Sequence, residues 1–405
     1  MDLLVNRDAA DILRLKSHIT KYMRDHFHSR RFLEYQTPIL AERAGGALAQ
    51  PFSTQSTVIS SRELMMRIAP ELWLKRLVIG GVDKVFEIGP VFRNEGIDSD
   101  HNPEFTMCEF YSAYMNLEGL ITETETLMCG LLEHCSTLIS TELTALPPIN
   151  FSFQRPFVQL EFVPALEQAL GFRLPKLSGS GAYPELIAML RLKGILAAGD
   201  QPPTMAKLLD RLSAMYLEPL SMTQPIFITN YPACMSPLAK SFVCPQTYQL
   251  VSARSEMFVR GREIANMYEE ENDPVEQARK LRAHREMVTS DTGDIIFSKN
   301  SPSLPASERM TPEEEAEAEL AAAQRAQWAQ QDVAGRRRAV ADPDGEVEPL
   351  DRSYVQAMHT GLPPTGGWGC GIERLVMLFS GANRISDCFS FGSLRNVVAT
   401  SADQK

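Results

Sequence analysis

The 405-residue sequence lacks several features that would assign it to a class at once. No apolar run approaches the roughly 18 residues of a transmembrane helix, so we expect no membrane span. The seven cysteines are odd in number and form no CxxC pair. This argues against a zinc site or a disulfide framework and favours free thiols in a reducing compartment. A Walker-type phosphate loop is also missing, so any nucleotide must be held in another way.

A surplus of basic charge is absent as well. The chain carries 51 acidic and 40 basic residues, a net charge of −11, which argues against bulk electrostatic binding of nucleic acid. A local basic patch is still compatible with that total. Residues 1–30 carry several acids in a helical pattern, which is not typical of a signal or transit peptide. At 44% hydrophobic residues, the chain can bury a large core as one big domain or two smaller ones.

The first informative feature that the sequence does contain is a predicted β-hairpin. Val, Ile and Phe dominate residues 84–92, and residues 105–111 alternate in the period of a strand. A surface hairpin with a charged tip is the simpler interpretation. The alternative is a binding site in which Arg93 holds a phosphate or carboxylate and Phe105 offers its ring to a base. Arg93 and Glu109 lie near strand ends, where a charge needs a partner or ligand. The side chains that the hairpin would present together are Arg93, Glu95, His101, Phe105 and Glu109.

A glycine-rich segment over 366–371 is followed by a helical pattern over 372–379. Glycines in a strand indicate the close approach of a ligand or another backbone. Arg374 falls in the first turn of the predicted helix, where a cation opposes the helix dipole, so it is better placed for an anion than for helix stability. The alternative is a tightly packed strand followed by a solvated arginine.

A third group of polar residues lies between positions 256 and 270. A predicted turn at Arg260 and Gly261 would bring Glu256 and Glu263 together as oxygen ligands for Mg²⁺ shared with phosphates. The alternative is a solvated pair of surface carboxylates. Asn266 and Glu270 are four apart, and we expect them to share one face of a helix.

The rest of the chain shows alternating helical and extended patterns. Helices are predicted over 8–31, 117–140 and 273–288, and a short strand ends at Pro38. Residues 164–220 are mostly helical with Pro and Gly breaks, which favours a helical insertion. Residues 291–350 are rich in Ser, Pro, Ala, Glu, Gln and Arg and favour a flexible, partly helical insertion.

Together the three polar stretches closely resemble the catalytic domain of class II aminoacyl-tRNA synthetases, and within it the lysine enzymes. The hairpin is similar to motif 2 of that class, the glycine-rich strand and helix to motif 3, and the strand at Pro38 to motif 1. The lysine-type resemblance lies in residues 67–75, 92–111, 231–240, 261–266 and 361–365. It implies an α+β fold (α/β in loose usage), a mostly antiparallel sheet flanked by helices, and a homodimer. It also implies one catalytic domain over 1–405.

Carried over position by position, the resemblance implies a role for each matching residue. Arg93 and Arg374 would be catalytic. ATP would be held by Arg93, Glu95, His101, Phe105 and Arg374. Lysine would be held by Gly46, Glu71, Arg93, Glu109, Tyr111, Asn266 and Glu270. The Mg²⁺ ligands would be Glu256 and Glu263. The implied substrates are lysine, ATP and tRNA(Lys), and the implied compartment is the mitochondrial matrix or the cytoplasm.

The sequence departs from the family pattern in three places. The family has an N-terminal anticodon-binding domain, and we expect it to be absent because Met1 lies at the start of the catalytic part. Gln50 stands where the family usually has arginine, and residues 387–396 lack two prolines of the family's last strand. Two other functions therefore stay open. One is a paralogue that attaches the amino acid to a protein, and the other is a degenerate, non-catalytic binding protein.

Overall fold

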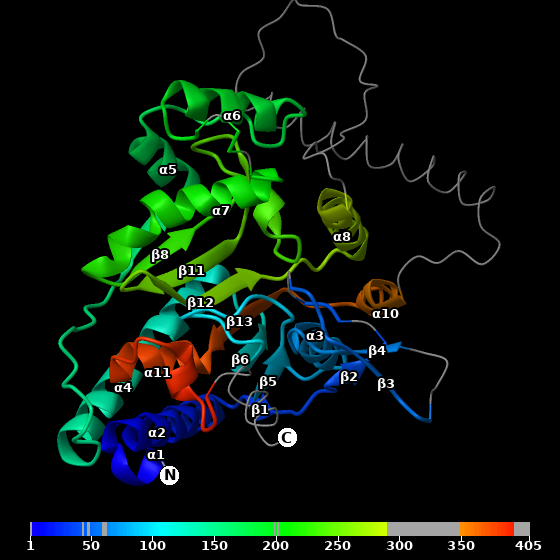
Figure 1. Ribbon diagram of the computed structural model, residues 1–405. Coiled ribbons are helices and arrows are strands. Elements are labelled where there is room, and N and C mark those ends of the chain that lie inside the picture. Colours follow the sequence, from blue (N-terminus) through cyan, green and yellow to red (C-terminus); the bar gives the residue numbers. More distant parts are fainter. Residues whose placement is uncertain are drawn as a thin grey trace, which may run out of the picture.

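The computed structural model describes residues 2–42, 44–46, 49–58, 63–197, 199–200, 202–289 and 349–392. Within these ranges, an eight-stranded sheet forms the centre of the molecule, in the order β1-β5-β6-β13-β12-β11-β8-β7 (Figure 1). The two outer pairs, β1 with β5 and β7 with β8, are parallel, and the pairs between them are antiparallel. The predicted α+β class and mostly antiparallel sheet are confirmed.

The strands of this sheet are short at its edges and long at its centre. Their bounds are β1 Leu33–Glu34, β5 Lys84–Phe92, β6 Glu104–Ala113, β7 Val158–Glu161, β8 Ile226–Thr229, β11 Arg254–Val259, β12 Arg262–Glu269 and β13 Thr365–Gly371. Two smaller sheets join β2 (Leu40–Ala41), β4 (Glu63–Met66) and β3 (Ser53–Gln55), and β9 (Ser241–Val243) with β10 (Leu250–Ser252).

The predicted hairpin is present with the expected faces. β5 and β6 pair from Lys84 with Ser112 to Phe92 with Glu104. Along β6, Cys108 and Phe110 enter the main hydrophobic core, so the intervening Glu109 and Tyr111 face the opposite side of the sheet. The period-2 pattern thus correctly separated core from site.

Three helices cover one face of the sheet: α2 (Arg7–Ser29), α4 (Leu117–Thr141) and α11 (Ile372–Ser380) (Figure 1). The short α1 (Asp2–Val5) precedes them. Leu15, Ile19 and Phe27 of α2 are fully buried in the core they share with the sheet. There Phe110 and Trp368 stack with ring centroids 5.2 Å apart. The predicted helices at 8–31 and 117–140 are confirmed to within two residues.

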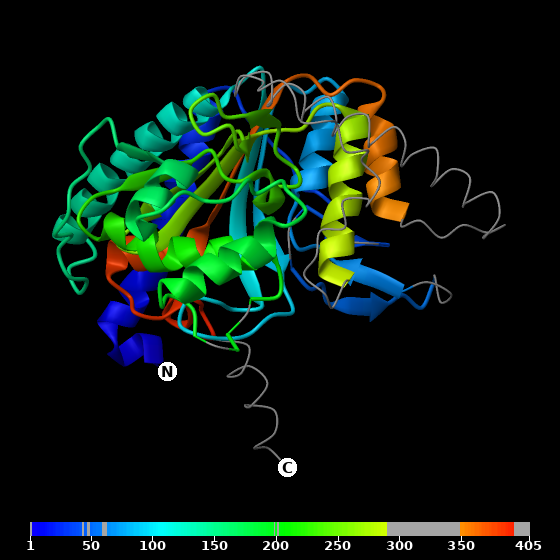
Figure 2. The same ribbon diagram turned by 90° about the horizontal axis from the view of Figure 1, so that it is seen from above.

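The other face carries α3 (Glu71–Ile79), α10 (Pro349–Met358) and α8 (Pro274–Thr289), which lie side by side in the view from above (Figure 2). Leu74 and Val78 of α3 pack with Val85, Tyr111 and Tyr354 in a second core. The predicted helix start at Asp273 is confirmed, since its carboxylate accepts the Val275 amide at 2.8 Å. Glu109 and Tyr111 therefore lie under α3 and α10.

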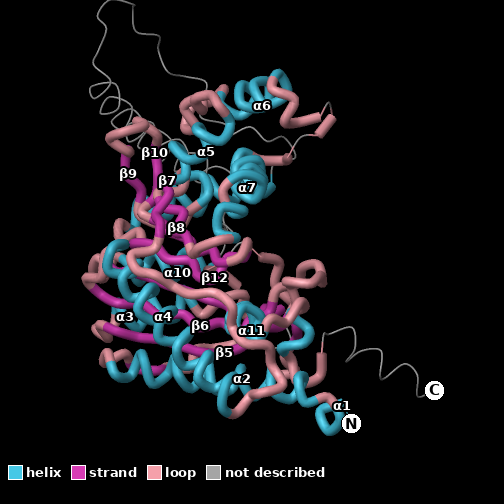
Figure 3. Tube along the Cα trace, turned by 90° about the vertical axis from the view of Figure 1, so that its left-hand side faces the viewer, coloured by secondary structure: helices cyan, strands magenta, loops and turns pink. Residues whose placement is uncertain are grey.

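The predicted helical segment packs at the far end of the sheet. It contains α5 (Phe162–Leu170), α6 (Ala182–Leu192), α7 (Met205–Tyr216) and the 3₁₀ turn η1 (Glu218–Met222) (Figure 3). Their leucines share a core with Ile226, Ile228 and Phe258, so these helices cover the β8 and β11 end of the sheet. The two other 3₁₀ turns in the described ranges are η2 (Ala233–Met235) and η3 (Ile385–Cys388).

Two expectations about local structure need correction. Asn266 lies within β12, and Glu270 directly follows that strand, so the two residues share no helical face. Residues four apart also share a face of a strand, and the spacing alone did not distinguish the two. The strand near Pro38 is shorter than expected, with β1 ending at Glu34. Proline has no amide hydrogen to donate to a ladder.

Some predicted features lie outside the described residues. Nearly all of the expected insertion at 291–350 is among them, and α10 begins at Pro349. None of the helices in the described ranges combines the length and apolar character of a membrane span. All seven cysteines fall within those ranges, and each is a free thiol.

Candidate active site

Arg93 lies at the mouth of the hairpin, directly after β5. Its backbone amide donates to the Pro103 carbonyl at 2.8 Å, which closes the loop between the two strands. Its guanidinium carbon lies 5.2 Å from the centroid of the Phe105 ring, and its Nε donates to the Ile68 carbonyl at 3.3 Å. Burial lowers the pKa of Arg93, and nearby Glu109 opposes that shift. The guanidinium therefore lies over the Phe105 ring, and its Nη2 lies 3.5 Å from the Met107 sulfur.

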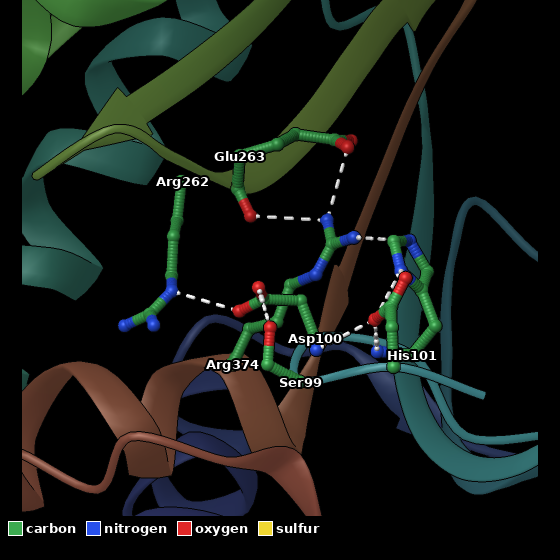
Figure 4. A network of polar contacts seen from close by, with 7 residues as sticks. Ser99, Asp100, His101, Arg262, Glu263 and Arg374 are labelled. Atoms are coloured by element: carbon green, nitrogen blue, oxygen red, sulfur yellow. Dashed lines mark hydrogen bonds and ion pairs between the residues drawn. The ribbon is translucent and has the colours of Figure 1, made fainter.

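Arg374, in the first turn of α11, points towards Glu263 and His101 (Figure 4). Its Nη1 donates to Glu263 Oε2 at 3.0 Å and to the Glu263 carbonyl at 3.2 Å. Its Nη2 lies 3.5 Å from Nε2 of His101 on the hairpin loop. Arg262 donates to Asp100 Oδ1 at 2.9 Å beside it. The loop of the hairpin is thus held against β12 and α11.

Two of the residues predicted to bind ATP, Glu95 and His101, are exposed to solvent. Glu95 is exposed, and its amide donates to the Arg93 carbonyl at 2.9 Å. The exposed His101 ring contacts the Asp98 carboxylate through Nδ1 at 2.9 Å. Phe105 is half-buried beneath Arg93. Asn94 donates its amide to the Gln50 carbonyl at 2.7 Å, so the unusual Gln50 joins this loop through its backbone.

Glu256 and Glu263 lie on adjacent strands, as the predicted turn at 260–261 requires. Glu256 accepts a hydrogen bond from the Tyr231 hydroxyl at 2.5 Å and also pairs with Arg254. Burial raises the pKa of Glu256 despite Arg254. Burial would also raise the pKa of Glu263, but Arg374 and Arg254 outweigh it and hold that pKa below its usual value. The two acids interact with each other, which suits a shared cation.

Three buried carboxylates form the inner end of the site: Glu71, Glu109 and Glu270. Glu71 begins α3, Glu109 is on β6, and Glu270 follows β12. Burial and the nearby Glu71 raise the pKa of Glu109 to about 8. The Tyr111 hydroxyl donates to Glu109 Oε2 at 3.0 Å, and the Tyr268 hydroxyl donates to Glu71 Oε1 at 2.7 Å. We call Glu71, Glu109 and Glu270 together the acid pocket.

Two glycines leave room beside the acid pocket. Gly46 adopts a φ of +91°, and a Cβ there would lie 2.9 Å from Glu71 Cβ. Gly367 on β13 lies opposite Tyr111 on β6, and a Cβ at Gly367 would collide with both Tyr111 and the Glu270 carboxylate. Glycine is therefore required at both positions for the chain to approach these acids.

Asn266, which was predicted to contact lysine from a helix, lies on strand β12. It pairs with Glu256 in the register of β11 and β12, and its Oδ1 accepts from Arg254 Nε at 3.0 Å. It therefore lies directly across from Glu256, four residues before Glu270. The predicted site residues extend along the central strands: Phe105 and Glu263 lie near the starts of β6 and β12, and Tyr111 and Glu270 lie at their opposite ends.

The groups that hold the acids in place were not predicted from the sequence. Lys75 is fully buried on α3 and pairs with Glu71 Oε1 at 2.5 Å and with Glu270. Tyr268, Tyr354 and Arg254 were missed as well. Lys75 follows Glu71 by four residues on α3, and that spacing is visible in the sequence. It usually indicates a solvated pair on a helix surface, so it did not reveal a buried one.

Comparison with known proteins agrees with this geometry. Residues 1–297 and 313–395 match the family described as tRNA synthetases class II (D, K and N). This chain belongs to that family. The match spans both halves of the site, the hairpin with Arg93 and the glycine-rich strand with Arg374. The resemblance to class II synthetases that the sequence indicated is therefore confirmed.

Individual members of the family resemble the chain over nearly its whole length. A mitochondrial lysine–tRNA ligase of Schizosaccharomyces pombe is 36% identical over 98% of this chain and 64% of the relative. A lysine–tRNA ligase of Cladosporium cladosporioides is 34% identical over 98% of the chain and 58% of the relative. A probable cytoplasmic lysine–tRNA ligase of Encephalitozoon cuniculi is 33% identical over 98% and 68%, respectively. The chain thus spans about 58 to 68% of the length of these relatives.

Proposed function

We propose that this chain activates lysine with ATP, releases pyrophosphate, and transfers the lysyl group to tRNA(Lys). One observation carries the proposal. A buried acid pocket adjoins a half-buried arginine, Arg93, so one end of the site suits ammonium groups and the other suits a carboxylate and a phosphate. The named relatives, which are lysine–tRNA ligases, support the same reaction.

The reaction requires positioning more than a protein nucleophile. The substrate carboxylate attacks the α-phosphorus of ATP in line, the bond to the β,γ-diphosphate breaks, and pyrophosphate leaves. Arg93 would hold the carboxylate and the α-phosphate, and Arg374 would hold the far end of the nucleotide. Two fixed cations stabilise the charge that develops on phosphate oxygens, and holding both reactants together lowers the entropic barrier. Glu95, His101 and Phe105 would orient the adenosine part.

The Glu256 and Glu263 carboxylates fit Mg²⁺. That ion binds through one or two carboxylates together with substrate phosphates and water, and no full protein cage is required. The described residues contain no group of three or more acids, histidines or cysteines arranged as such a cage. In the Mg²⁺-bound state, these two residues would hold the ion against the ATP phosphates, where it would supply further positive charge.

The acid pocket would select lysine by its charge. Gly46 and Glu71 would hold the α-ammonium, Glu109 and Tyr111 with Glu270 the ε-ammonium, and Asn266 the carboxylate. Charged hydrogen bonds contribute about 1.5–3 kcal/mol each. A site built around such a group rejects substrates that lack it by roughly 10⁴-fold.

The remaining parts of the proposal concern assembly and location. We propose a homodimer, supported by the exposed apolar side chains Leu33, Ile39 and Leu40 near β1 and β2. We propose one catalytic domain with insertions over 164–220 and 291–350. The names of the relatives support the mitochondrial matrix or the cytoplasm as the compartment.

The proposal is tested by lysine-dependent exchange of pyrophosphate into ATP. Arg93→Ala should reduce exchange by roughly 10²-fold or more, because it removes a transition-state cation. Arg211→Ala, on the surface of α7 and paired with Asp200, is the matched control and should retain activity. Full exchange in Arg93→Ala would overturn the assignment. Acylation of tRNA(Lys), compared with labelling of translation-factor lysines, then distinguishes the ligase from a protein-modifying enzyme.

A further inference from the structure

Lys75 is a buried cation that the proposed binding of lysine and ATP does not use. It has no exposed surface and lies on α3, one turn after Glu71. Its ammonium contacts Glu71 Oε1 at 2.5 Å and pairs with Glu270. Three tyrosine rings surround it, with centroids 5.9, 5.7 and 5.7 Å away for Tyr111, Tyr268 and Tyr354. Such a charge is costly to bury, and the cost is offset only where oppositely charged groups pair with it.

Titratable groups from several elements lie around Lys75. Glu71 is on α3, and Glu109 and Tyr111 are on β6. Tyr268 is on β12, Glu270 directly follows that strand, and Tyr354 is on α10. Burial would lower the pKa of Lys75, but Glu270 and Glu71 outweigh it and raise that pKa well above the usual value. Lys75 therefore stays charged.

Lys75 changes the net charge of the acid pocket. The three carboxylates of the acid pocket carry three negative charges when all are ionised, and Lys75 cancels one of them. The remaining two equal the charge of the two ammonium groups of a lysine substrate, whose carboxylate is left for Arg93. Without Lys75, one acid would have no partner in the complex and would have to stay protonated.

We propose that Lys75 is a positioning and specificity residue, a fixed internal ammonium that matches the acid pocket to a substrate with two ammonium groups. The inference rests on the proposed function, because it assumes that lysine is the substrate. By this logic Glu109 is the acid that meets the new charge of the side chain, while Glu270 is already half neutralised by Lys75. An amino acid with an uncharged side chain leaves a buried carboxylate without a cation and is rejected.

The test is a double-mutant cycle on lysine affinity, measured by calorimetry. Glu270→Gln leaves Lys75 with less negative charge and should weaken lysine binding by roughly tenfold or more, because a buried cation then repels the substrate. Lys75→Met should also weaken binding, since one carboxylate becomes surplus. The Lys75→Met, Glu270→Gln double variant restores the balance and should bind lysine more tightly than Glu270→Gln alone. A double variant that binds no tighter than Glu270→Gln overturns the proposal.

A pH series separates this role from a purely structural one. In Glu270→Gln, Lys75 has lost an acid partner and should deprotonate more easily, so rising pH should improve lysine binding more than in the double variant. Equal pH dependence in the two proteins would contradict the proposal. The affinity for ATP alone shows that each variant is folded, and Lys21→Met, on the exposed side of α2, is the control for a lost lysine. If Glu270→Gln does not fold, Glu71→Gln replaces it, because Glu71 is the other partner of Lys75.

The outcomes also separate this inference from the proposed function. A wild-type protein that binds ATP but not lysine overturns both. A wild-type protein that binds lysine and performs exchange, together with no recovery in the double variant, overturns only the role of Lys75.

Discussion

Gly367 on β13 lies directly opposite Tyr111 on β6, and the ring of Tyr111 occupies the space where a side chain at position 367 would begin. A Cβ at Gly367 would lie 2.6 Å from Tyr111 Cε1, and it would also collide with the Glu270 carboxylate. These two neighbours are part of the proposed lysine site. Glycine at position 367 is therefore required for Tyr111 and the Glu270 carboxylate to lie where they do.

Gly367→Ala should for this reason raise the KM for lysine by roughly tenfold or more, since a small displacement of binding groups has a large effect on rate. The KM for ATP should change little, because Arg93 and Arg374 are not displaced. The measurement is pyrophosphate exchange at varied lysine and varied ATP. Gly181→Ala is the control, because that glycine has a φ of −100° and no atom within 4 Å of an added Cβ. An unchanged KM for lysine in Gly367→Ala would show that the site lies elsewhere.

Lysine affinity should depend on pH through Glu109. Its pKa is raised to about 8 by burial and by Glu71, so Glu109 holds a proton in the empty site at neutral pH. An incoming ammonium must displace that proton. Lysine affinity should therefore weaken as pH falls below about 8, by up to tenfold per pH unit. Glu109→Gln should bind lysine weakly at every pH and should lose this dependence. Calorimetry across this pH range measures both effects, and a pH-independent wild-type affinity would argue against the assignment.

The same group makes folding stability depend on pH. The folded pKa of Glu109 is about 8 and the usual value is 4.5, so the folded protein holds one more proton between these values. This contribution to stability is present below about pH 4.5 and is lost as pH rises towards 8, at up to about 1.4 kcal/mol per pH unit. Glu109→Gln should flatten the decline. Denaturant melts at several pH values, with and without the substitution, measure the difference.

A buried ion pair beneath the hairpin should matter far more for stability than one on the surface. Arg67 pairs with Glu87 at 2.5 Å, and both side chains are about 4% exposed. Arg67 also donates to the Pro90 carbonyl at 2.8 Å, which links β4 to β5. Arg67→Met should destabilise the protein by about 3–5 kcal/mol, because it leaves Glu87 buried without its cation.

The matched comparison is the exposed pair of Lys21 and Asp25 on α2, with side chains 72% and 64% exposed. Lys21→Met should change the free energy of unfolding by less than about 1 kcal/mol. Urea denaturation of the two variants tests the contrast, and similar losses in both would contradict it.

The Mg²⁺ requirement should shift when Glu263 is neutralised. Glu263→Gln removes a proposed metal ligand and also the partner of Arg374 at 3.0 Å. We expect exchange activity to need roughly tenfold more Mg²⁺ for half-maximal rate, with a smaller change in the KM for lysine. Asp100→Asn, which breaks the neighbouring pair with Arg262, serves as the control for loss of an acid near the loop. An unchanged Mg²⁺ requirement in Glu263→Gln would exclude it as a ligand.

The local hydrophobic pattern predicted the structure correctly for elements that bury one face in the core. The alternation along 105–111 separated Glu109 and Tyr111 from the core residues Cys108 and Phe110, and the structure confirms that division. The helix over 8–31 was predicted for the same reason, since one face of it is buried. The spacing of Asn266 and Glu270 failed as a guide, because a separation of four fits a helix and a strand equally well.

The sequence by itself determined which residue types are available and which local elements hold them: the hairpin of Arg93 and Glu109, the glycine strand before Arg374, and the turn between Glu256 and Glu263. The tertiary structure alone decided which charges meet. Lys75 looks like a surface lysine on its own helix, and only the packing of α3 against β6, β12 and α10 buries it between Glu71 and Glu270. The reason is physical. Periodicity is local, whereas the partners of a buried charge come from segments that are distant in sequence.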